Sequence, residues 1–133
     1  MLSTNYNEKR KKYFYYTIIL IFFLSISSVK GFAQNCNTAL PTIRFASNKT
    51  NLTQDAQKIL AAIAETLKNN PGCTITISAG LNSTKSGQAI CQKRGETTKA
   101  FFVEKLSINP DRMNINCTYD ITNVNIVEFS WYY

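Results

Sequence analysis

The sequence predicts an α/β fold in which two helices pack on one face of a four-stranded mixed sheet, in the order β-α-β-α-β-β. Several short segments alternate apolar and polar residues, as half-buried strands do. Two longer segments carry apolar residues at helical spacing, and Pro, Gly and Asn separate the segments. The chain has 133 residues, which is enough for one domain with a single core.

The first part of the chain, residues 1–33, is expected to be a leader and not part of this domain. Basic residues 9–12 precede an apolar run from Tyr13 to Val29, and Gly31 and Ala33 are the small residues that a signal peptidase requires. The pattern therefore predicts export, with cleavage after Ala33. An uncleaved membrane anchor is the alternative, because about 17 apolar residues is near the lower limit for a transmembrane helix. The domain would lie outside the cytoplasm in that case too.

The domain is expected over residues 42–133, after an extended lead-in at residues 34–41. Thr42–Ala46 alternates as a short strand, and Thr53 is placed to cap the helix that follows. The apolar stripe of this helix consists of Ala56, Ile59, Leu60, Ile63 and Leu67. Asn70-Pro71-Gly72 ends the helix, and its stripe is expected to bury against the sheet.

The stretch from Cys73 to Gly95 organises the rest of the chain. It begins with the alternating strand Thr74–Ala79, passes through a polar loop and enters a second helix, predicted from about Gly87 to Leu106 with Ser86 as its N-cap. The N–H groups at a helix N-terminus face outward and favour anions. Any binding site is therefore expected in this loop.

Two further strands complete the predicted sheet. Pro110 ensures that the second helix has ended. Arg112–Tyr119 and Val124–Tyr132 both alternate apolar and polar residues, and a short turn at Asp120–Asn123 joins them.

The four cysteines all lie beyond the leader, and an even number in an exported domain of this size predicts two disulfides. Right-handed crossovers make the first three strands point the same way. Cys36 and Cys73 then lie at one end of the sheet, and Cys91 and Cys117 lie at the other. The predicted pairs are Cys36–Cys73 and Cys91–Cys117. A zinc site is disfavoured, because the chain has no histidine and no Cys-x-x-Cys pair.

Charge and composition argue against several classes of function. Removal of residues 1–33 takes away five of the 15 basic residues and one of the eight acidic residues, which leaves about +3. Because the remaining basic residues are scattered, nucleic-acid binding is not expected. Without histidine there is no Ser-His or Cys-His pair, so the sequence predicts neither an enzyme nor a bound cofactor or metal. Membrane contact is expected only through the N-terminal segment.

Two motifs carry a family resemblance that covers residues 42–130. Ile90-Cys91-Gln92-Lys93-Arg94-Gly95 matches the pattern L-S-x-x-R-A, and Val127-Glu128-Phe129 looks like the tail of the pattern N-R-R-V-E. With them the chain resembles the OmpA-like C-terminal domain, the family of periplasmic modules that hold outer-membrane proteins to peptidoglycan. The resemblance implies a bacterial cell-envelope protein, periplasmic or associated with the outer membrane.

The same resemblance implies a ligand site that lacks one of the family's charged residues. In the family, the aspartate of a G-H-T-D segment and the arginine of L-S-x-x-R-A grip diaminopimelate in the peptidoglycan stem peptide. Here Gly80-Leu81-Asn82-Ser83 stands in that segment, so Ser83 replaces the aspartate. Asn125 and Ile126 replace the two arginines of N-R-R-V. The residues expected to form the site are Arg94, Gly80, Asn82 and Ser83.

Two functions remain open at this stage. The first is association with peptidoglycan, in which Arg94 binds a carboxylate while the ligand's ammonium lacks an acidic partner, a loss that costs about 2–5 kcal/mol. The second is a degenerate OmpA-like scaffold that binds envelope proteins without binding peptidoglycan, through the open face of the sheet or Trp131-Tyr132-Tyr133. For Arg94 itself, a solvated pair with Lys93 on an exposed helix face is the alternative to a ligand site.

Overall fold

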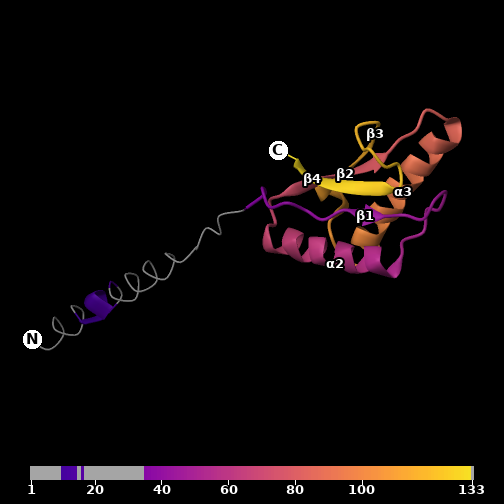
Figure 1. Ribbon diagram of the computed structural model, residues 1–133. Helices are drawn as coiled ribbons and strands as arrows, with labels where there is room; N and C mark the ends of the chain where they lie inside the picture. Colours follow the sequence, from indigo (N-terminus) through magenta and orange to yellow (C-terminus); the bar gives the residue numbers. More distant parts are fainter. Residues whose placement is uncertain (1–9, 15, 17–34, 133) are drawn as a thin grey trace, which may run out of the picture. The chain divides into compact units, whose positions relative to one another are not determined.

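The computed structural model describes residues 10–14, 16 and 35–132 (Figure 1). The chain divides after Ala33 into two units. In the first unit, residues 10–14 and 16 are helical, whereas the predicted cleavage site and most of the apolar run lie outside the described residues. Within the described ranges, no helix combines the length and the apolar character that a membrane crossing requires.

The second unit is the α/β domain, and its elements follow the predicted order β-α-β-α-β-β with one short 3-10 helix added. The elements are β1 (Ile43–Arg44), α2 (Gln54–Asn69), β2 (Thr74–Gly80), α3 (Lys85–Glu104), η1 (Pro110–Arg112), β3 (Met113–Thr118) and β4 (Ile126–Tyr132). The last strand folds back into the middle of the sheet, so the strand order is β1-β4-β2-β3.

The sheet is mixed, as predicted. Strand β4 is antiparallel to both of its neighbours, β1 and β2, whereas β2 and β3 are parallel. The first three strands therefore point the same way. In Figure 1, β1 runs between β4 and helix α2.

One face of the sheet forms the core with the two helices. The register places Ile77 beside both Ile115 and Phe129, and Ile43 beside Val127, so the apolar residues of all four strands share this face. The buried residues of α2 are Ala56, Leu60, Ile63, Ala64 and Leu67. The opposite face is polar and carries Thr76, Ser78, Asn114, Asn116 and Ser130.

Side-chain caps decide where both helices begin. The hydroxyl of Thr53 accepts a hydrogen bond from the Ala56 N–H at 3.1 Å, so this predicted cap is confirmed. Ser86 was the wrong cap for α3, which begins two residues earlier than predicted, after Thr84. The hydroxyl of Thr84 accepts from the Gly87 N–H at 3.0 Å. Asn82 fixes Thr84 in this role, because its Oδ1 accepts from both the backbone N–H and the hydroxyl of Thr84.

Two disulfides link distant parts of the domain, and they are the predicted pairs. Cys36–Cys73 ties the lead-in to the start of β2, with 5.7 Å between the Cα atoms. Cys91–Cys117 ties α3 to β3, with 5.9 Å between the Cα atoms. One disulfide therefore stands at each end of β2, as expected from parallel β1, β2 and β3.

Candidate functional site

Arg94 lies on α3 and is buried, with only 2% of its surface exposed. It is among the largest fully buried side chains of the described residues. Its neighbour Lys93 is exposed, as expected for adjacent helical positions that point in different directions. The alternative in which Arg94 and Lys93 form a solvated pair is therefore wrong for Arg94.

The guanidinium of Arg94 donates hydrogen bonds to four neutral oxygens. Nε donates to the carbonyl of Lys49 at 2.8 Å, and Nη1 donates to the carbonyl of Val124 at 2.7 Å. Nη2 donates to the carbonyl of Ala46 at 3.0 Å and to Asn125 Oδ1 at 3.1 Å. We call these four groups the oxygen cradle. It consists of residues from two loops that are far apart in sequence, so Arg94 joins the β1–α2 loop to the β3–β4 loop.

The β1–α2 loop is shaped to present its two carbonyls. The Lys49 N–H donates to the Ala46 carbonyl at 3.0 Å and closes a tight turn. Asn48 in this turn has a positive φ of 55°, a conformation that asparagine adopts more readily than most residues. Beneath the turn, the guanidinium of Arg94 lies 5.1 Å from the ring centroid of Phe45, a distance suited to a cation–π interaction.

The β3–β4 loop is held by asparagine side chains. Asn123 Oδ1 accepts from the Asn125 N–H at 2.9 Å, and the Asn123 carbonyl accepts from the Ile126 N–H at 3.0 Å. These bonds curl the loop so that Val124 and Asn125 both direct oxygens at Arg94. Asn125 stands where the resembled motif has an arginine, and here it is an acceptor.

The charge of Arg94 is balanced by dipoles. Within residues 35–132, its partners are three carbonyls and one amide, with no carboxylate among them. Burial lowers the pKa of Arg94 from its usual value. Arginine nevertheless remains protonated at neutral pH, because its usual pKa lies far above that pH. Arg94 therefore acts in this structure as a cation that binds two loops together.

The other residues of the expected site are only partly brought to Arg94. Gly80 ends β2, and a Cβ at this position would collide with the backbone of Val124, whose carbonyl accepts from Arg94. Gly80 and Arg94 thus share a neighbour. Asn82 and Ser83 are exposed, and no hydrogen bond connects either of them to Arg94 among the described residues. The side chain of Asn82 instead accepts hydrogen bonds from Thr84, the N-cap of α3.

Arg112 is a second arginine of structural importance that the sequence analysis did not single out. Its Nε and Nη2 donate to the Cys73 carbonyl at 2.9 and 2.8 Å, and Nη2 also donates to Leu67 and Asn70 at 2.8 and 2.7 Å. The carbonyls at a helix C-terminus lack partners within the helix, so Arg112 completes the end of α2. Burial lowers the pKa of Arg112 as well.

No cluster of three or more His, Cys, Asp or Glu residues that could hold a metal ion occurs in the part of the chain that the structure describes. The four cysteines are all engaged in disulfides.

Comparison of the sequence finds no matching family model and no curated protein with significant similarity. Solved structures are similar in fold. The OmpA-like domain of FopA1 from Francisella tularensis matches with a TM-score of 0.57 and 17% identity, over 66% of this chain and 68% of that one. The peptidoglycan-associated lipoprotein from Burkholderia pseudomallei matches with a TM-score of 0.57 and 16% identity, over 68% and 89%. The C-terminal domain of Helicobacter pylori MotB matches with a TM-score of 0.59 and 14% identity, over 71% and 86%.

Proposed function

Because the chain has the OmpA-like fold, we propose that it is a non-catalytic module of the bacterial cell envelope, exported and facing the periplasm. We further propose that it binds another envelope protein and does not bind diaminopimelate through Arg94. One observation carries this choice: Arg94 is 2% exposed and its guanidinium is bonded to the four oxygens of the cradle.

The energetics disfavour ligand binding by the family mode. A ligand carboxylate would have to displace the carbonyls of Lys49 and Val124 from Arg94. A buried carbonyl left without a donor costs about 1–3 kcal/mol. The ammonium of the same ligand would also find Ser83 in place of an acid, which costs about 2–5 kcal/mol in affinity. Both terms oppose binding of a zwitterionic amino-acid head.

Peptidoglycan association is the second candidate function, and the likeness to a protein named peptidoglycan-associated lipoprotein favours it. In this case, the two loops of the oxygen cradle would open and release Arg94 to the ligand. An acid from elsewhere in the domain would have to meet the ammonium.

Co-sedimentation with sacculi that contain diaminopimelate tests the choice. Residues 34–133 are suitable because they form one compact unit that holds every member of the core cluster. We expect the oxidised domain to stay in the supernatant, whereas the peptidoglycan-associated lipoprotein serves as a positive control that pellets. Pelleting of the unmodified domain would overturn the proposed function.

Ser83→Asp identifies the obstacle to peptidoglycan binding. This substitution restores an acid at the position where the resembled motif has one. We expect it to gain no binding, because Arg94 remains in the oxygen cradle. Ser86→Asp, at another exposed position nearby, is the matched control for added charge. Pelleting of Ser83→Asp alone would show that the missing acid was the only obstacle, and the argument from the cradle would be wrong.

A further inference from the structure

Strand β1 lies at one end of the sheet, and among the described residues it pairs only with β4, so its outer edge is unpaired there. The Phe45 N–H donates to the Asn125 carbonyl at 2.8 Å, and Ile43 pairs with Val127, so the backbone groups of residues 43 and 45 face β4. Because these directions alternate along an antiparallel strand, the backbone groups of Thr42 and Arg44 face outward. Within residues 35–132, no hydrogen bond uses these groups of Arg44, which makes the edge a template for another strand.

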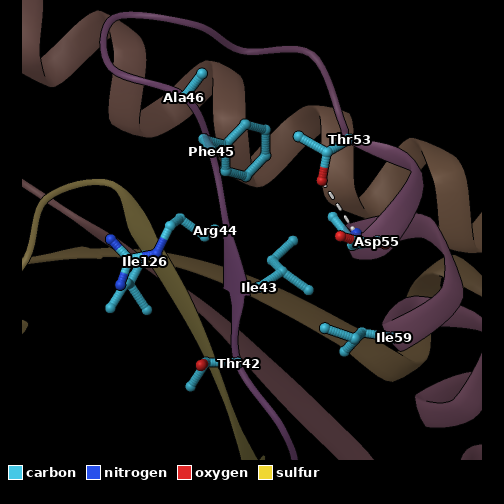
Figure 2. A pocket seen from close by; sticks show the side chains of 10 residues that line it. Thr42, Ile43, Arg44, Phe45, Ala46, Thr53, Asp55, Ile59 and Ile126 are labelled. Atoms are coloured by element: carbon cyan, nitrogen blue, oxygen red, sulfur yellow. Dashed lines mark hydrogen bonds between the residues drawn. The ribbon is translucent and has the colours of Figure 1, made fainter.

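A hollow of about 470 Å³ runs along this edge, between β1 and the start of α2 (Figure 2). Its apolar lining includes Ile43, Ala56 and Ile59. Asp55 and Thr53 stand at the end of the hollow that belongs to the first turn of α2. Ile43 and Ala56 are already almost fully buried, whereas Ile59 is only partly buried and still has apolar surface to cover. An extended segment lying against β1 would therefore find space for side chains beside Ile59.

The two sides of the edge differ in charge. Figure 2 shows Arg44 and Ile126 on one side of β1, and Ile43, Ile59 and Asp55 on the other. Arg44 and Asp55 are both exposed, and the described residues supply neither of them with an ion-pair partner. In an added strand, a residue opposite Arg44 would point to the same side as Arg44, and its two neighbours would point into the hollow.

We infer that the outer edge of β1 docks an extended segment of a partner protein that carries an acidic residue between two apolar residues. The acidic residue pairs with Arg44, the apolar residues fill the hollow beside Ile43 and Ile59, and the backbone adds a fifth strand to the four-stranded sheet. This inference rests on the proposed function and names the kind of envelope protein that the domain binds.

Two features shape the expected interaction. Pro41 and the turn at Ala46–Lys49 limit the extended stretch to residues 42–46, so few hydrogen bonds form and the affinity of an isolated segment is low. A second copy of this chain is a poorer occupant. Symmetric pairing of two β1 edges centred on Arg44 would place two guanidinium groups side by side, and like charges opposite each other destabilise a sheet.

Titration of isotope-labelled, oxidised residues 34–133 with a capped peptide, followed by amide NMR, tests the site. The probe is Thr-Val-Glu-Val-Thr. We expect amide shifts at Thr42, Arg44 and Ala46 and along the first turn of α2. A peptide with Lys in place of the central Glu should bind about two- to fivefold more weakly. A peptide methylated on the backbone nitrogen of the central Glu should lose binding, because it cannot donate to the strand edge.

Charge reversal provides the specific control. Arg44→Glu should reverse the preference, so that the Lys peptide binds better than the Glu peptide. Lys85→Glu makes the same change at an exposed position that does not line the hollow, and it should leave the preference unaltered.

Three results would overturn the inference: no shifts along β1, an unchanged preference in Arg44→Glu, or concentration-dependent dimers that pair through β1. The result of the peptide titration can be distinguished from the result of the sacculus assay. A domain that pellets with sacculi and still binds the peptide would refute the proposed function while leaving this site intact. A domain that neither pellets nor binds the peptide would refute only the site on β1.

Discussion

Arg94 and Arg112 solve a similar problem in two different regions of the domain. Both are bound by backbone carbonyls with no acidic partner among the described residues, and burial lowers the pKa of both. Each also lies close to a disulfide. Arg94 follows Cys91 by one helical turn, and Arg112 donates to the carbonyl of Cys73.

The two regions differ in what the arginine holds together. Arg112 completes the C-terminus of α2, where the helix dipole already favours a cation. Arg94 joins two loops, and no helix C-terminus contributes to its oxygen cradle. The carbonyls of Lys49 and Val124 have no other donor within residues 35–132. Arg94 should therefore contribute more to stability, although its position in a motif first indicated a ligand site.

The largest effect is expected from Arg94→Ala. It leaves the part-buried carbonyls of Lys49 and Val124 without a protein donor, each at a cost of about 1–3 kcal/mol, so the free energy of unfolding should fall by about 2–6 kcal/mol. Urea denaturation of oxidised residues 34–133 measures this change. Arg94→Lys keeps the charge, but a lysine cannot reach all four oxygens. Its free energy of unfolding should therefore lie between those of the unmodified domain and Arg94→Ala. A loss below about 1 kcal/mol would show that the cradle is not an important contact.

Removal of each disulfide in turn tests whether the two bridges contribute equally to the free energy of unfolding. The cysteines of each pair are 37 and 26 residues apart, so loop entropy predicts nearly equal losses of about 3–4 kcal/mol. Urea denaturation of the double Cys→Ser variants of Cys36–Cys73 and of Cys91–Cys117 measures the two losses. Losses that differ by more than about 2 kcal/mol would mean that contacts around one bridge, and not chain entropy, control its contribution.

The fold could be predicted because it depends on periodic patterns. The alternating residues of Thr74–Ala79 and the helical stripe from Ala56 to Leu67 each require one face to be buried, and this fixes the type of element. The parallel direction of the first three strands then fixed both cysteine pairs. The position of β4 between β1 and β2 was not predicted, because alternation does not identify a strand's neighbour.

The surroundings of Arg94 could not be predicted for a different reason. Its partners are mostly carbonyls, which every residue carries, so no residue type marks them in the sequence. In the sequence, Asn125 stood out only because it replaces an arginine of the motif. The cap at Thr84 was missed because it depends on Asn82, two residues earlier, and a hydroxyl at Ser86 has the same signature. Local geometry, and not residue composition, determines both the surroundings of Arg94 and the cap of α3.

A smaller loss is expected from Arg112→Ala. The substitution removes the hydrogen bonds of Arg112 to Leu67, Asn70 and Cys73, but the carbonyls of Leu67 and Asn70 keep backbone donors, from Asn70 and Cys73. Arg112 is also only half-buried, so water can replace it in part. The free energy of unfolding should fall by about 1–3 kcal/mol. Exposed Lys105→Ala is a control for loss of a cation near a helix C-terminus, and a loss from Arg112→Ala that exceeds the loss from Arg94→Ala would reverse the comparison.

The smallest effect is expected at Asn48, which sets the turn that supplies two oxygens to Arg94. Its φ of 55° is strained for a β-branched residue, so Asn48→Val should lower the free energy of unfolding by about 1–2 kcal/mol. Asn48→Gly removes that strain at the expense of a more flexible unfolded chain, and it should be nearly neutral. If the turn matters mainly through Arg94, the loss from Asn48→Val should shrink in an Arg94→Lys background. Equal losses in both backgrounds would show that strain in the turn acts independently of the oxygen cradle. Arg94 would then be stabilised mainly by the β3–β4 loop.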